Sequence, residues 1–164
     1  MRTTTILILT CLCLTTCRNI NTAQPPSYDY TVRVISVSDG DTFRGLTADN
    51  KQIRFRIHGI DAPETKQAYG NRSKQYLSNL IFGKTVRIKI QTKADRYGRP
   101  VVWVYTLDGK DVGAEMLRAG MAWHYKQYDK SQAYARLENM ARRGQRGLWR
   151  DKNPVPPWDY RRKR

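Results

Sequence analysis

Cysteine is absent from most of the chain. All three cysteines fall within the first 17 residues. Residues 18–164 can therefore form neither a disulfide among themselves nor a thiolate metal site. Histidine is scarce too, since only His58 and His124 are present, and this shortage argues against zinc. Any fold in 18–164 must be stabilised by packing and hydrogen bonds.

Acidic residues are outnumbered about two to one. The chain has 30 Lys+Arg against 14 Asp+Glu, a formal net charge of +16. Such a surface attracts polyanions, nucleic acids among them, although charge alone also fits a membrane-surface binder. A hydrophobic content of 40% is ordinary for a globular protein and excludes a fully disordered chain. The choice of function must come from motifs.

Long hydrophobic runs are also missing. The uncharged run from Thr3 to Thr16 is rich in leucine, isoleucine and threonine, but it is too short to span a bilayer comfortably. It follows Arg2 and precedes a polar stretch, which is the order of a secretory signal and the start of a mature protein. We expect a signal peptide at 1–17, a linker at 18–27, and export to the periplasm, the outer membrane or the medium.

The end of this leader leaves two forms of the exported protein open. Leu14-Thr15-Thr16-Cys17 resembles a bacterial lipobox, in which Cys17 would become the acylated first residue. Thr16 is a poor match for the small Gly or Ala usual at that position. A lipid anchor at Cys17 and a free secreted chain therefore both remain as alternatives, and the anchor is the one membrane attachment that we expect.

Apolar patterning predicts about five strands. Residues 31–37 are rich in β-branched side chains, and Asp39-Gly40-Asp41 separates them from Thr42-Phe43, as in a β-hairpin. Apolar and polar residues alternate along 51–60, the pattern of a half-buried strand. Two more strands are predicted at 85–91 and 101–107.

Three helices are predicted among and after these strands, at 74–82, around 112–120 and at 131–143. Five strands with helices in this order indicate an α+β fold, a five-stranded OB-fold β-barrel with three packed α-helices, over 28–150. We interpret 151–164 as a basic C-terminal tail of irregular chain.

Four carboxylates lie at two predicted strand ends. Asp39 and Asp41 sit in the hairpin turn, where turn chemistry alone would explain them. Asp61 and Glu64 follow the strand at 51–60, where a helix cap would also explain them. Considered together they favour a hard divalent cation such as calcium, which takes several oxygen ligands. Asp41 and Asp61 are the predicted direct ligands.

Two arginines are suited to bind a phosphate beside these carboxylates. Arg56 lies on the polar face of the strand that leads into Asp61, and Arg99 lies in the turn Tyr97-Gly98-Arg99. A guanidinium fork donates parallel hydrogen bonds to phosphate and stabilises the charge that develops during its hydrolysis. Each could equally be one of many surface arginines.

Several blocks resemble, in order and spacing, the signatures of the thermonuclease (staphylococcal nuclease-like) family. The similarity runs from about residue 31 to 149. The blocks are Asp39-Gly40-Asp41-Thr42, Phe55-Arg56, Ile60-Asp61-Ala62-Pro63-Glu64-Thr65, Asp95-Arg96-Tyr97-Gly98-Arg99, Asp108-Gly109-Lys110-Asp111-Val112 and Gly147-Leu148-Trp149.

This resemblance implies one calcium site, with Asp41 and Asp61 binding through carboxylates and Ala62 through its backbone carbonyl. Glu64 would orient or deprotonate the attacking water. Ala62 replaces a threonine of the best-known member, a change that keeps the carbonyl. The segment 65–71 is shorter than in that member.

The resemblance also implies that Arg56 and Arg99 hold the phosphate and that Tyr97 touches a neighbouring phosphate. Tyr125 and Tyr128 are both candidates for a second substrate tyrosine, and the sequence favours neither.

The function expected is that of an exported, calcium-dependent nuclease acting on DNA and RNA, with single strands preferred, and the resemblance implies 3′-phosphorylated products. Little sequence selectivity is expected, because phosphate contacts position a nucleic acid without specifying its sequence. We expect a monomer with no obligate protein partner. The alternatives are a non-catalytic OB-fold nucleic-acid-binding protein of the cell envelope and a cationic adhesion protein.

Overall fold

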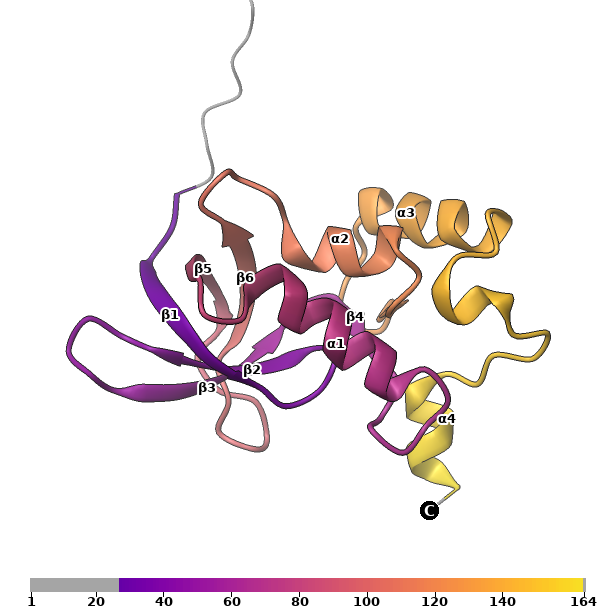
Figure 1. Cartoon of the computed structure of the whole chain (residues 1–164), viewed down its shortest axis with the longest axis horizontal. Helices are drawn as coiled ribbons and strands as arrows, with labels where there is room; N and C mark the ends of the chain where they lie inside the picture. The colour runs from indigo at the N-terminus through magenta and orange to yellow at the C-terminus, as the bar shows by residue number, and fades with distance from the viewer. Residues whose placement is uncertain (1–26, 164) are drawn as a thin grey trace, which may run out of the picture.

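A closed five-stranded barrel forms one side of the molecule, and the helices lie beside it (Figure 1). The computed structural model describes residues 27–163, so the predicted signal peptide at 1–17, nearly all of the linker and Cys17 lie outside the described residues. Around the barrel the strands follow the order β1-β2-β3-β6-β5, and all neighbours are antiparallel except β3 and β6. The strands are β1 (Tyr30–Val37), β2 (Thr42–Leu46), β3 (Gln52–Ile57), β5 (Thr85–Thr92) and β6 (Val101–Thr106). The predicted α+β barrel is confirmed.

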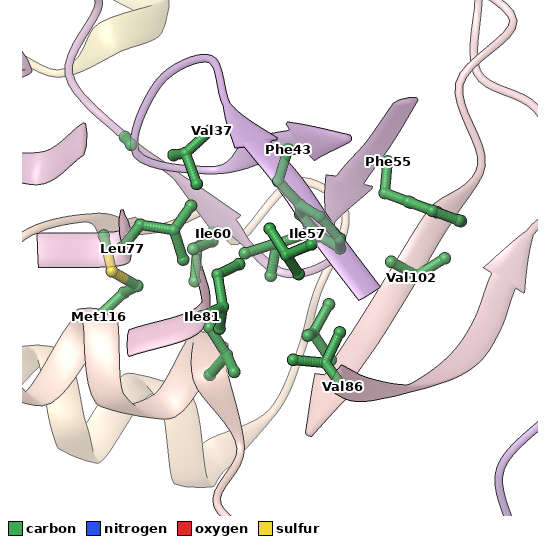
Figure 2. Close-up of a cluster of buried hydrophobic side chains, with 14 of the residues drawn as sticks. Val37, Phe43, Phe55, Ile57, Ile60, Leu77, Ile81, Val86, Val102 and Met116 are labelled. Atoms are coloured by element: carbon green, nitrogen blue, oxygen red, sulfur yellow. The ribbon is translucent and has the colours of Figure 1, made fainter. Parts of the chain in front are cut away.

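The barrel interior is filled by the apolar residues that alternate along these strands. Phe43 of β2 and Phe55 of β3 are fully buried and stack with their ring centroids 5.2 Å apart. Figure 2 shows them with Ile57 and Val102 in one continuous cluster. Burying such side chains stabilises the fold by about 2 kcal/mol each, which compensates for the missing disulfides.

Three helices cover one side of the barrel, close to where the sequence places them. Their bounds are α1 (Gly70–Ile81), α2 (Val112–Arg118) and α3 (Gln132–Arg143). The side chains of Asp111 and Ser131 cap α2 and α3 by accepting hydrogen bonds from backbone N–H groups of the first turn. Leu77 and Ile81 of α1 lie in the core beside Met116 of α2 (Figure 2). None of the helices in 27–163 is both long enough and apolar enough to cross a membrane.

Two short strands that the sequence did not predict join the barrel to the helices. They are β4 (Ile60–Asp61) and β7 (Trp123–His124), and they pair antiparallel with Asp61 opposite Trp123. Two-residue strands are too short to show any alternation, so patterning misses them. Their pairing fixes the backbone of Asp61.

The C-terminal tail differs from the prediction. Instead of irregular chain throughout, it contains a short helix, α4 (Pro157–Arg162), with proline at its first position, and a 3-10 turn, η1 (Gly147–Arg150), comes just before the tail. In Figure 1 α4 lies at the edge of the molecule, below α1. The prediction was wrong because six residues show no helical period; a proline at N1 is the one local sign of a helix start.

Candidate active site

The site begins at the turn before β2. Asp41 is buried, and its backbone N–H donates to Asp39 Oδ1 (3.1 Å). Asp41 Oδ2 accepts a 2.7 Å hydrogen bond from the backbone N–H of Ala62. Gly40 is packed so closely that a Cβ would lie 1.8 Å from Ser73 Oγ of α1. The turn therefore packs directly against α1 and Ala62, and the hydrogen bond from Ala62 holds Asp41 at the end of β4.

Arg56 bridges the two predicted metal ligands. Its Nη1 lies 3.1 Å from Asp41 Oδ2, and its Nη2 lies 3.0 Å from Asp61 Oδ1. Nη1 also donates to the carbonyl of Ile57 (3.0 Å). The Arg56 side chain is 13% exposed and the carboxylates are still less exposed. The Arg56 guanidinium of β3 thus forms ion pairs with two buried carboxylates, those of Asp41 and Asp61.

Glu64 stands on the loop that leads from β4 to α1. Its backbone N–H donates to Gln67 Oε1 (3.1 Å), and its carbonyl accepts from the backbone N–H of Gln67 (2.8 Å). The loop is therefore a folded turn. The Glu64 side chain is 36% exposed, so water can reach its carboxylate.

Arg99 is held by its own turn. Its Nε and Nη2 contact Asp95 Oδ2 at 2.9 and 2.8 Å. Its Nη1 donates to Thr42 Oγ1 (3.2 Å), and that hydroxyl donates to Asp41 Oδ1 (3.1 Å). Arg99 therefore reaches the carboxylates through Thr42. Tyr97 is 66% exposed and lies beneath the guanidinium groups of Arg96 and Arg99, 4.8 and 5.2 Å from its ring centroid.

The sequence analysis missed one residue of the site, Arg161 of α4. Its Nη2 lies 2.8 Å from Asp61 Oδ2, and its Nη1 lies 3.2 Å from Asp61 Oδ1 and 2.8 Å from Glu64 Oε1. Hydrogen bonding to Asp61, and then to Glu64, raises the pKa of Arg161 above its usual range. The only signal in the sequence was a basic tail, which does not say where a particular arginine will dock.

One cavity of about 700 Å³ brings these groups together. All predicted site residues line it, and Arg161 borders it too. They are Asp41, Arg56, Asp61, Ala62, Glu64, Tyr97 and Arg99. Tyr125 and Tyr128 also line the cavity, so the geometry leaves the choice between them open. The structure thus assembles the whole predicted constellation from four separate segments of chain.

Asp41 carries the strongest electrostatic signature of the site. Burial raises its pKa well above the usual range; Arg56 opposes this rise, and Asp39 and Asp61 add to it. Burial thus disfavours the ionised form of Asp41 when no further positive charge lies beside it. A hard divalent cation fits a donor set made only of oxygens. Within 27–163 no group of three or more His, Cys, Asp or Glu side chains is arranged to hold a metal ion, so water would have to supply part of the coordination shell.

The two histidines belong to a separate buried cluster. Asp129 lies between them, 3.3 Å from His58 Nε2 and 2.8 Å from His124 Nε2. His58 also packs on the Trp103 ring, with centroids 4.6 Å apart. Burial lowers the pKa of His58 despite Asp129. These contacts give the histidines a packing role in the wall of the cavity, which His58 lines.

Comparison with known proteins agrees with this geometry. The family model described as "Staphylococcal nuclease homologue" matches residues 54–151, more than half of the chain. This chain belongs to the staphylococcal nuclease family. It is 45% identical over 132 residues to an "Uncharacterized endonuclease" of Escherichia coli O157:H7, with 80% of this chain and 85% of the relative covered. A Haemophilus influenzae protein with the same printed name is 44% identical, with 80% and 73% covered.

A plant member is similar over a smaller share of its length. A "Probable staphylococcal-like nuclease" of Oryza sativa subsp. japonica is 42% identical over 130 residues, which is 79% of this chain and 33% of the relative. The family resemblance seen in the sequence blocks is thus confirmed, and the nuclease domain recurs inside larger proteins.

The shared guanidinium generates a stability prediction. Arg56→Gln leaves Asp41 and Asp61 buried with one fewer positive partner, so we expect the free energy of unfolding to fall by about 3 kcal/mol. Arg54→Gln is the matched control, because Arg54 is an exposed residue of the same strand, and it should cost less than about 0.5 kcal/mol. Urea denaturation in chelator-treated buffer measures both. Equal stability of the two variants would contradict the bridging role of Arg56.

Proposed function

We propose that the protein is an exported, calcium-dependent nuclease that hydrolyses phosphodiester bonds of DNA and RNA with little sequence specificity. The observation that carries the proposal is the single cavity in which Asp41, Asp61 and Glu64 face the guanidinium groups of Arg56 and Arg99. Membership of a nuclease family and the printed names of the relatives support the same reaction class.

Each group in the cavity suits one part of phosphodiester hydrolysis. Asp41 and Asp61 would hold the cation together with the carbonyl of Ala62. A bound divalent cation supplies positive charge that polarises a phosphoryl oxygen. Arg56 and Arg99 would donate hydrogen bonds to the phosphate and stabilise the extra negative charge of its transition state.

Glu64 is placed to act as the general base for the attacking water. It is the one carboxylate of the three that is substantially exposed. It would orient that water and accept its proton, while the bond to the 5′ oxygen breaks and a 3′-phosphorylated end remains.

The substrate proposal follows from contacts that every nucleotide offers. Guanidinium groups and a cation bind phosphate without reading bases. Tyr97 is exposed beside this cavity and offers a face on which any base can stack. Single-stranded DNA and RNA are the preferred substrates in this proposal, and the protein acts as a monomer without an obligate protein partner.

Calcium dependence is tested with plasmid DNA and single-stranded RNA. We expect degradation of both by the purified protein in calcium, complete loss of activity after chelation, and recovery when calcium is added back. A gel assay records all three states. Binding without cleavage under every condition would instead support the non-catalytic envelope protein, and full activity after chelation would remove the cation from the mechanism.

The role of Glu64 has a sharper test. Glu64→Gln removes the proton acceptor but keeps the shape, so kcat should fall by about a hundredfold or more while the KM changes little. Glu115→Gln on α2 is the matched control, because Glu115 does not line the cavity and pairs with Arg118 on its own helix. Initial rates on a labelled oligonucleotide measure both. An unchanged kcat for Glu64→Gln would exclude this residue as the base.

Export is the remaining part of the proposal. The exported protein is either free or attached to a membrane through a lipid on Cys17. Calcium outside the cytoplasm is abundant enough to fill a weak site. We expect the mature chain made from the full sequence to lack residues 1–16 at least. Intact-mass measurement of the N-terminus tests this: a retained leader would contradict export, and a diacylated Cys17 would establish the anchor.

A further inference from the structure

Arg161 occupies the carboxylates on which the proposed function depends. It lies one hundred residues from Asp61 in the sequence, yet its two terminal nitrogens contact both oxygens of Asp61 and one of Glu64. A fork in contact with two carboxylates is the geometry of a strong guanidinium pair. The Arg161 side chain is 39% exposed, so it can leave without disturbing the core.

The helix that carries Arg161 is docked by several independent contacts. The Trp158 ring stacks on Tyr125 at a centroid distance of 5.3 Å and an interplanar angle of 5°, and it meets Trp123 edge-on at 5.7 Å. Tyr160 Oη donates to the carbonyl of Lys66 (3.2 Å). Just before the helix, the carbonyl of Val155 accepts a 2.6 Å hydrogen bond from Gln67 Nε2. These contacts join α4 to the loop that bears Glu64, so the position of Arg161 is built into the fold.

A guanidinium and a divalent cation cannot both use these oxygens fully. Asp61 Oδ1 already receives hydrogen bonds from Arg56 and Arg161, and Oδ2 receives one more from Arg161. A carboxylate oxygen has two lone pairs, so the buried Asp61 has little acceptor capacity left.

The charges of the site lead to the same conclusion. Three carboxylates, Asp41, Asp61 and Glu64, face the guanidinium groups of Arg56 and Arg161. A cation bound to the oxygens of Asp61 would lie next to the docked Arg161 guanidinium. The two positive charges would repel each other in a poorly hydrated site, so electrostatics disfavours their presence together.

We propose that α4 is an intramolecular gate, in which Arg161 holds Asp61 and Glu64 until a divalent cation displaces it. The gate rests on the proposed calcium site and deepens it. Docking of Arg161 and binding of the cation are mutually exclusive, so each weakens the other by the same factor. While Arg161 is docked, Oε1 of Glu64 is also engaged and is not available to water. Cation binding therefore delivers the charge and releases the base in one step.

The gate is tested by calcium titration calorimetry on the purified whole protein without nucleic acid. Arg161→Ala removes the competitor, so calcium should bind about tenfold more tightly than to the wild type. Arg161→Lys, which keeps the charge but not the fork, should lie between the two. Arg162→Ala is the matched control, because the neighbouring Arg162 is 76% exposed, pairs with Asp159 and does not contact the carboxylates.

Amide hydrogen exchange over 159–163 gives a second measurement that does not depend on activity. Calcium should speed exchange there in the wild type, and Arg161→Ala should show the fast rate without calcium. Calcium affinity that is unchanged or weakened in Arg161→Ala would overturn the gate while leaving the nuclease proposal intact. Absence of calcium binding to wild type and variant alike would overturn both the gate and the calcium site.

Discussion

The guanidinium of Arg56 between Asp41 and Asp61 is the interaction on which the site depends. Two carboxylates this deeply buried would repel each other and would each pay a desolvation penalty of several kcal/mol if unpaired. Arg56 and the backbone N–H of Ala62 offset part of that penalty. The turn before β2 and the end of β4 can therefore meet without unfolding, and the remaining negative charge attracts a cation.

The topology of the barrel puts these groups in one row. Arg56 on β3 pairs across the sheet with Thr42 of β2 on one side and with Val101 of β6 on the other. Asp41 comes immediately before Thr42, and Arg99 comes two residues before Val101. Because Arg56 is paired with both Thr42 and Val101, the turn at 95–99 and the Asp41 turn both lie close to Arg56. Arg56, Arg99 and Asp41 thus come together through the register of three neighbouring strands.

Sequence reasoning succeeded where the signal was local and failed where it depended on docking. The strands can be predicted from the sequence because apolar residues alternate along them. The candidate site residues can be predicted because they occupy strand ends and turns within recognisable blocks; they are Asp41, Asp61, Glu64, Arg56 and Arg99. The pairing of β4 with β7 could not be predicted, because strands of two residues are too short to show an alternation of apolar and polar side chains. Arg161 could not be chosen among many arginines, because its position is decided by Trp158 packing on Tyr125, a contact between distant segments.

Three of the four tryptophans form one cluster beside the site. Trp123 contacts both Trp149 and Trp158 edge-on, and its backbone pairs directly with Asp61, whereas Trp103 lies apart against His58. Three of the four indole rings are therefore coupled to the C-terminal helix or to the strand that carries Asp61. Intrinsic fluorescence should consequently sense events at the carboxylates without any attached dye.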